Sequence, residues 1–169
     1  MSKNTRVILT KRPVDDATPD CFSVETVEDE ALENGQVRVA VEYISVDAGT
    51  RTMLRGEGFH AQVSLGQTIL AGGVGRIIES TVDGWYKGQA VRGGLGAQTI
   101  ATVMPKMLEK VDDTVGSLSA HLGALGASTG VTSWIGVRKV AKPQPGDIFV
   151  VSAAAGAVHN LSNQLTTSG

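Results

Sequence analysis

The residues best suited to chemistry lie near the end of the chain, between Pro143 and His159. A Pro/Gly turn leads into the apolar run 148–151, and a loop of alanine and glycine follows. In a dinucleotide-binding loop, a strand feeds a small-residue turn and a helix, so that backbone N–H groups at the helix start face a diphosphate. Because bulky side chains would block that approach, the composition of Ala155–Val158 suits a cofactor loop. We therefore predict a strand from Ile148, the loop, and then a helix.

The segment after this strand is short for a complete nucleotide-binding unit. One βαβ unit takes about 30 residues or more, and fewer than that follow Asp147. We expect the chain to start a nucleotide-binding domain and to stop inside its first unit.

Composition indicates a globular protein with no electrostatic bias toward a particular partner. The 169 residues are 41% hydrophobic and 19% charged, with a formal net charge of −2. This charge gives no reason to expect binding to nucleic acid or to a membrane. A single cysteine, Cys21, excludes an internal disulfide and suits a reducing compartment. No signal peptide or long apolar stretch is apparent, so we predict a soluble cytoplasmic protein.

Short strand patterns dominate the part of the chain that must support the loop. From Gln36 to Val46 apolar and polar residues alternate, with a change of parity that predicts a bulge near Ile44-Ser45. The apolar run Thr68–Ser80 is interrupted by glycines, as in a strand bent at a barrel corner where side chains must be absent. Many short strands divided by glycine turns indicate a small barrel. Further strands are predicted over 6–10, 22–27, 87–91 and 98–103.

Helical patterns occur beside the strands and again before the loop. Asp47 can cap a helical turn over 47–54, which places Asp47 and Arg51 four residues apart on one face. Ser117 or Ser119 can cap a short helix that ends near Leu122. A longer helix is predicted from Thr132 to Ala141, because Pro143 cannot continue it.

The residues that most often bind metals are too scattered to predict a metal site. Cys21, His60, His121 and His159 show neither a Cys-x-x-Cys spacing nor a paired-histidine spacing. No Ser/His/Asp set has a recognisable spacing either. We therefore predict no metal and assign no catalytic residue.

A series of motifs in fixed order resembles the N-terminal half of a zinc-independent medium-chain dehydrogenase/reductase. The branch that it resembles contains the prostaglandin and alkenal reductases and their bacterial NADP-dependent relatives. The motifs are Ser45-Val46-Asp47 with Arg51, Gly72-Gly73-Val74-Gly75-Arg76-Ile77-Ile78-Glu79-Ser80, Leu122-Gly123-Ala124-Leu125-Gly126, Gly130-Val131-Thr132-Ser133-Trp134, Pro143-x-Pro145-Gly146-Asp147, and Val150-Val151-Ser152-Ala153-Ala154-Ala155-Gly156-Ala157-Val158.

This resemblance implies a mainly β GroES-like barrel with helices, followed by the first β-α of a truncated α/β Rossmann domain. The implied divisions are a barrel domain over 1–125, a connecting helix over 126–142, and the start of the NADP-binding domain over 143–169. It also implies NADP(H) as cofactor and double-bond reduction of α,β-unsaturated ketones or aldehydes as activity. We expect the 169-residue chain alone to have little activity.

The residues that the resemblance assigns to the site fall into two groups. Thr132, Ala155, Gly156, Ala157 and Val158 are implied to contact the cofactor, with Thr132 reaching the nicotinamide carboxamide. Asp47 and Arg51 are implied to line the substrate cleft.

Simpler interpretations of the same residues remain open. The loop can be a plain strand-to-helix turn, Thr132 can bond within its own helix, and Asp47 and Arg51 can be a helix cap and a surface ion pair. The chain can also be a non-catalytic GroES-like interaction module that forms a homodimer through the strand at Ile148.

The chain departs from the family pattern at two places that bear on the site. His159 stands where the family has a glycine that permits close helix–strand packing, so we expect the imidazole to push the helix away from the strand. Residues 47–51, Asp-Ala-Gly-Thr-Arg, replace the family's Asp-Pro-aromatic-Met-Arg.

Overall fold

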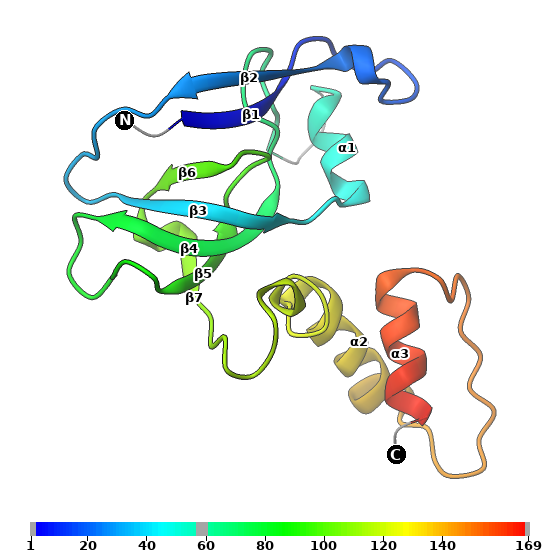
Figure 1. Ribbon diagram of the computed structural model, residues 1–169. Coiled ribbons are helices and arrows are strands. Elements are labelled where there is room, and N and C mark those ends of the chain that lie inside the picture. Colours follow the sequence, from blue (N-terminus) through cyan, green and yellow to red (C-terminus); the bar gives the residue numbers. More distant parts are fainter. Residues whose placement is uncertain (1–2, 57–60, 168–169) are drawn as a thin grey trace. The chain divides into compact units, whose positions relative to one another are not determined.

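Antiparallel strands follow one another between Lys3 and Lys110 in the computed structural model, which describes residues 3–56 and 61–167 (Figure 1). The chain divides into two compact units, Met1–Asp113 and Thr114–Gly169, which we call unit 1 and unit 2. Unit 1 contains every strand of the described residues, and unit 2 is helical. The domain limits implied by the resemblance, at 125/126 and 142/143, stay predictions.

A two-stranded antiparallel sheet forms one part of unit 1. It pairs β1 (Lys3–Leu9) with β2 (Phe22–Glu28), which confirms the two strands predicted there. The short 3-10 turn η1 (Pro19–Cys21) leads into β2. Single bridges from β1, Arg6 to Gln98 and Ile8 to Thr68, join this pair of strands to the rest of unit 1.

The larger sheet has five antiparallel strands in the order β6-β3-β4-β5-β7. In Figure 1, β3 and β4 run side by side through it. The 3-10 turn η2 (Pro105–Met107) connects β6 to β7. The strands are β3 Val37–Ile44, β4 Gly72–Ser80, β5 Ala90–Gly94, β6 Ile100–Val103 and β7 Leu108–Lys110.

The irregularity in β3 lies earlier than predicted. The register between β3 and β4 shifts at two places, between Arg38 and Val39 and between Val41 and Tyr43. The second shift is the one near the predicted bulge, so the position expected at Ile44-Ser45 is wrong by about two residues. Glu42 is the extra residue, and one extra residue moves the side chains after it to the opposite face of the sheet. The change of apolar parity in the sequence is therefore the downstream effect of a bulge at Glu42.

Close contact between β3 and β4 explains one of the glycines in β4. A Cβ atom on Gly75 would lie 2.0 Å from the backbone oxygen of Ala40. No other residue type fits at this position without moving a strand. The prediction that side chains must be absent from this run is confirmed at Gly75.

Two clusters of buried apolar side chains form the core of unit 1. The first lies against the five-stranded sheet and consists of Val37, Val39, Ile77, Val91, Leu95, Ala101 and Leu108. The second lies between β1 and the residues around the short helix α1 (Ala48–Leu54), and it consists of Leu9, Leu54, Val63 and Ile69. Each cluster joins residues far apart in sequence, so unit 1 is held together by long-range apolar contacts.

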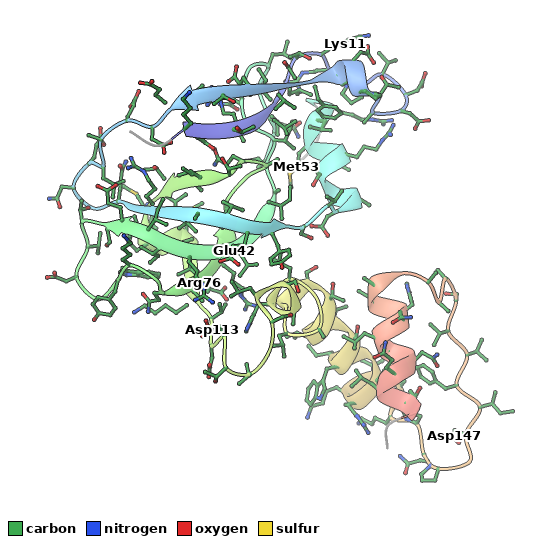
Figure 2. The ribbon with its side chains drawn as sticks, viewed as in Figure 1. Lys11, Glu42, Met53, Arg76, Asp113 and Asp147 are labelled. Carbon is green, nitrogen blue, oxygen red and sulfur yellow. The ribbon has the colours of Figure 1, made fainter. Side chains whose placement is uncertain are left out.

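Figure 2 shows Glu42, Arg76 and Asp113 close together on unit 1. The Arg76 guanidinium lies 3.5 Å from the Glu42 carboxylate and 2.7 Å from that of Asp113. Arg76 thus holds both the bulge of β3 and the last residue of unit 1 against β4.

Unit 2 consists of two helical segments and the chain between them. After the short turn η3 (Leu118–His121), η4 (Ala127–Val131), α2 (Thr132–Trp134) and η5 (Ile135–Ala141) follow without a break. We call these three elements the 127–141 helix. It begins five residues before the predicted start and ends at Lys142, which has a left-handed φ of 49°. The second segment is α3 (Ala157–Thr167), the helix predicted after the loop.

The strand predicted from Ile148 is not formed. Residues 148–151 have no strand partner among the described residues, and Ile148 and Val150 are 92% and 85% exposed. An extended segment becomes a strand only when a neighbouring strand takes up its backbone hydrogen bonds. The β-rich part of the expected fold is therefore confirmed, whereas of the expected β-α start only the helix is present.

None of the helices in residues 3–56 and 61–167 is both long enough and apolar enough to cross a lipid bilayer.

Candidate functional site

The predicted cofactor loop leads directly into α3. The Gly156 N–H donates to the Ala153 carbonyl over 2.8 Å, and the Gly156 carbonyl accepts the first helical bond from Asn160, also at 2.8 Å. Ala153 has a left-handed φ of 49°, which turns the chain toward the helix. The first amides of a helix have no partner within it. Ala155, Gly156 and Ala157 are exposed, so this end of α3 offers N–H groups with small side chains around them.

His159 lies on the exposed side of this turn. A Cβ atom on Gly156 would be 3.2 Å from both the His159 Nδ1 atom and the Ala153 backbone oxygen. The imidazole therefore lies beside the loop and limits the residues that fit at Gly156. Because the strand at 148–151 is not formed, the expected displacement of α3 from that strand stays a prediction.

The 127–141 helix presents one buried stripe, formed by Gly126 just before it and by Gly130, Ser133 and Val137. These residues are spaced by four, three and four, which places them on one helical face. A Cβ on Gly130 would lie 1.9 Å from the Ala124 backbone oxygen, so the turn before the helix packs directly on its backbone.

Ser133 connects this stripe to the cofactor loop. Its side chain is fully buried, and its Oγ atom lies 2.7 Å from the Thr129 carbonyl and 2.8 Å from the Val158 carbonyl. Thr132, the predicted nicotinamide contact, immediately precedes it and is exposed. The structure therefore brings the helix that carries Thr132 next to the end of the Ala155–Val158 loop, with Ser133 as the link.

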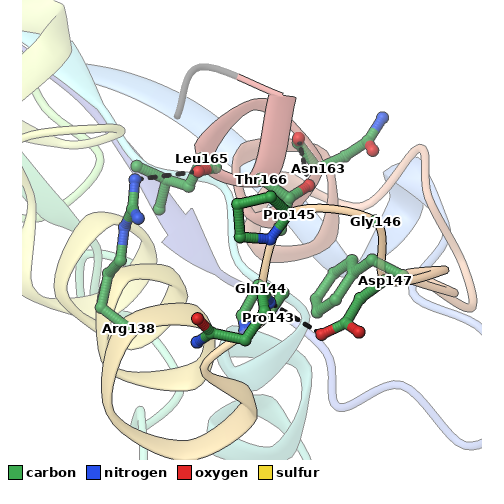
Figure 3. A pocket seen from close by; sticks show the side chains of 10 residues that line it. Arg138, Pro143, Gln144, Pro145, Gly146, Asp147, Asn163, Leu165 and Thr166 are labelled. Atoms are coloured by element: carbon green, nitrogen blue, oxygen red, sulfur yellow. Dashed lines mark hydrogen bonds between the residues drawn. The ribbon is translucent and has the colours of Figure 1, made fainter.

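A pocket of about 580 Å³ opens elsewhere in unit 2, between residues 143–149 and the second half of α3 (Figure 3). Arg138 donates to the Leu165 carbonyl over 3.2 Å, and the Gln144 N–H donates to the Asp147 carboxylate over 2.7 Å. None of the predicted cofactor residues lines this pocket. The pocket and the loop are therefore separate features of unit 2.

The predicted substrate-cleft residues belong to unit 1, where they do not bond to each other. Asp47 precedes α1 as its N-cap residue, and its backbone oxygen accepts the Thr50 N–H over 3.0 Å, but its side chain makes no capping bond. The Arg51 guanidinium lies 3.1 Å from the exposed Asp16 carboxylate. This agrees with a surface ion pair for Arg51, although with a different partner, while the cleft role stays a prediction.

Within residues 3–56 and 61–167, no three His, Cys, Asp or Glu side chains are placed to hold a metal ion. Cys21 is buried beside the Thr18 hydroxyl, and His121 is also buried. His60, considered from the sequence, lies outside the described residues.

Two residues of these sites were missed by sequence reasoning. Ser133 belongs to the buried stripe of the 127–141 helix, whose residues are spaced by four, three and four. This spacing places Ser133 between Gly130 and Val137 on one helical face, which indicates a buried hydroxyl. Asp16 gave no signal, because it lies in a loop and reaches Arg51 only through the fold of unit 1.

Comparison with known proteins places most of unit 1 in one sequence family. The family described as the N-terminal domain of oxidoreductase matches residues 5–111. The NADPH-dependent curcumin reductase of Escherichia coli (strain K12) is 30% identical over 164 residues, which are 96% of this chain and 47% of that protein. The NADP(+)-dependent 2-alkenal reductase of Nicotiana tabacum is 34% identical over 125 residues, or 72% of this chain and 36% of that protein.

The fold also agrees with that of a solved structure. CurA from Vibrio vulnificus superposes with a TM-score of 0.81 and 25% identity, covering 98% of this chain and 49% of that one. The chain thus spans about half, or less, of the length of each of these proteins.

Proposed function

This chain belongs to the medium-chain dehydrogenase/reductase family, whose N-terminal domain matches residues 5–111. On that premise we propose that the chain is part of an NADP(H)-dependent reductase, and that the enzyme reduces carbon–carbon double bonds conjugated to a carbonyl group. The relatives named above act on curcumin and on 2-alkenals. The proposed substrates are accordingly α,β-unsaturated ketones and aldehydes. The observation that carries the proposal is the small-residue turn that opens directly into α3.

The loop has the properties that a dinucleotide diphosphate requires. Its residues carry side chains no larger than a methyl group from Ala153 to Ala157, and the first amides of α3 follow at once. Ala155, Ala157 and Val158 would hold the diphosphate through backbone N–H groups, assisted by the positive end of the helix dipole. The N–H of Gly156 already donates to the Ala153 carbonyl, so Gly156 would contribute by the absence of a side chain, which lets the diphosphate approach the loop. Thr132 would bind the nicotinamide carboxamide through its hydroxyl.

Bound NADPH would supply a hydride to the carbon β to the carbonyl, and protonation of the α-carbon completes the reduction. The part of this chain is to bind and orient, since a nicotinamide and an enone react only when they are held face to face at short range. Thr132 fixes the ring end of the cofactor and the loop fixes its diphosphate. We assign no proton donor among the residues of this chain.

Within unit 1, the start of α1 would contact the substrate. Asp47 is exposed there, and Ala48 and Gly49 leave the surface without large side chains. A Cβ on Gly49 would meet no atom within 4 Å. This open surface suits a bulky acceptor, and Arg51 would reach a carbonyl oxygen only by leaving Asp16.

The proposal is tested by calorimetric titration of the purified chain with NADPH, followed by a turnover assay with an enal and with curcumin. We expect NADPH to bind weakly and to be displaced by NADP+, with little turnover by the 169-residue chain alone. The E. coli curcumin reductase serves as the positive control. Absence of NADPH binding at millimolar concentration would exclude a cofactor role for the loop in this chain.

A second candidate function is a non-catalytic interaction module that forms a homodimer. It is favoured by the exposure of Ile148 and Val150, in an apolar segment that pairs with no strand among the described residues, because such a segment can add to a strand of another chain. Analytical ultracentrifugation of the wild type and of a variant with Ile148→Thr and Val150→Thr separates the two candidates. A dimer that the double variant abolishes supports the module, and a monomer in both cases rejects it.

A further inference from the structure

Ser133 is a fully buried polar side chain that joins the two parts of the proposed cofactor site. Its relative exposure is 0%, and its hydroxyl contacts the 127–141 helix at the Thr129 carbonyl and the start of α3 at the Val158 carbonyl. We propose that Ser133 is a positioning residue that sets the cofactor loop against Thr132. The expected effect on cofactor binding rests on the proposed function, whereas the link between the two helices rests on the contacts of Ser133 within unit 2.

The hydroxyl of Ser133 has one proton and two carbonyl acceptors within 2.8 Å. The bond to Thr129 lies within the 127–141 helix and is local. The bond to Val158 spans 25 residues and is the contact that ties the two helices together at the loop. Sliding or rotation of α3 along the 127–141 helix would separate the buried Ser133 hydroxyl from the Val158 carbonyl and so lose one buried hydrogen bond between the helices.

The contact between Ser133 and Val158 connects residues of both parts of the proposed cofactor site. Thr132 is the preceding residue, and Val158 is the last residue of the proposed diphosphate loop. A single side chain therefore links the helix that carries Thr132 to the last residue of the loop. The affinity of a ligand that contacts both Thr132 and the loop depends on how these two parts are placed relative to each other. The affinity of a ligand that contacts only the loop does not.

The chain offers a matched control at Ser162. Its Oγ atom donates to the same Val158 carbonyl over 2.8 Å, but from within α3, four residues along. Ser162→Ala removes a hydroxyl donor from that carbonyl and leaves the connection between the helices intact. Ser133→Ala removes the connection. Comparison of the two variants separates positioning from the loss of one hydrogen bond.

The experiment measures the affinities of NADPH and of 2′-phospho-ADP-ribose, which lacks the nicotinamide, for the full chain and its variants. We expect Ser133→Ala to weaken NADPH binding about fivefold, the effect of losing one buried hydrogen bond, and to change binding of the nicotinamide-free ligand by less than about twofold. Ser162→Ala should change neither by more than about twofold. Ser133→Thr, which retains the hydroxyl, should restore NADPH binding.

Equal weakening of both ligands by Ser133→Ala, or equal effects of the two alanine variants, would overturn the proposal and leave Ser133 with a structural role only. If the wild type binds neither ligand, the proposed function fails in this chain, and amide hydrogen exchange decides the positioning role separately. Faster exchange in the first turn of α3 for Ser133→Ala than for Ser162→Ala supports it, whereas equal exchange rejects it.

Discussion

Unit 1 contains two clusters of buried apolar side chains, whereas most of the large apolar side chains of unit 2 lie at its surface. In unit 2 the buried apolar side chains among residues 114–167 are Leu118 and Val137. The exposed large ones are Val115, Leu125, Val131, Trp134, Ile135, Val140, Ile148 and Val150. Burial of apolar area is the main favourable term in folding, so the two units differ in what stabilises them.

The two units differ in how far the contacts within each one account for its stability. Unit 1 closes its sheets over its own core, and its sequence family covers nearly all of it. Unit 2 relies on backbone contact at Gly130, the Ser133 bridge and the packing of two helices. Its other large apolar side chains are exposed, and exposed apolar side chains that gather in one patch mark sites of protein interaction.

The same substitution in the two units gives the largest expected contrast. Ile77→Ala removes a fully buried side chain from the first cluster and should lower the free energy of unfolding by about 3 kcal/mol. Ile148→Ala removes a side chain that is 92% exposed and should change it by less than about 0.5 kcal/mol. Urea denaturation of both variants measures the difference. A cost at Ile148 equal to that at Ile77 would show that residues 148–151 are covered in solution.

Two glycines of the 127–141 helix test whether unit 2 depends on close backbone contact. Gly130→Ala places a Cβ 1.9 Å from the Ala124 backbone oxygen, and such overpacking should cost about 2 kcal/mol. Gly136→Ala meets no atom within 4 Å and should instead stabilise the helix by about 0.5–1 kcal/mol. Limited proteolysis within residues 114–167 reports the change. Similar protease resistance in both variants would contradict the role of the Gly130 contact.

Substitution of surface charges in unit 1 should have the smallest effect on the free energy of unfolding. The pKa of Asp20 lies below its ordinary value of 3.8, first because the Thr18 hydroxyl donates to it and then because Lys11 donates to it over 2.9 Å. The same contact raises the pKa of Lys11. A lowered carboxyl pKa stabilises the fold above its unfolded pKa, and this contribution is lost as the pH falls through the lowered value.

NMR titration of the Asp20 carboxyl measures this effect. Thr18→Ala should raise its pKa more than Lys11→Gln does, and neither variant should change stability at neutral pH by a measurable amount, because the pair is exposed. A large loss of stability in either variant would mean that the surface of unit 1, in addition to its core, holds the unit together.

The sequence predicted unit 1 well, because its periodic signals reflect its own core. The alternation over Gln36–Val46 produced β3 to within about two residues at each end. The parity change was detected but placed too late, since an extra residue at Glu42 becomes visible only in the side chains that follow it.

The sequence was less informative where structure depends on a partner. An apolar, β-branched run at 148–151 has the composition of a buried strand, but composition cannot supply the neighbour that a strand requires. In the same way, Asp47 and Arg51 have the spacing of a helical pair, yet the tertiary fold offers Arg51 the carboxylate of Asp16 instead. Helix α3 was predictable because its backbone bonds are local.

The two tryptophans of the chain fall one to each unit, and each lies beneath a lysine. The Lys110 Nζ atom is 4.9 Å from the Trp85 ring in unit 1, and the Lys139 Nζ atom is 5.2 Å from the Trp134 ring in unit 2. Each unit therefore carries its own intrinsic fluorophore. In a Trp134→Phe or a Trp85→Phe variant, the fluorescence of the remaining tryptophan reports the unfolding of one unit. The order in which the two units unfold can therefore be observed without an added label.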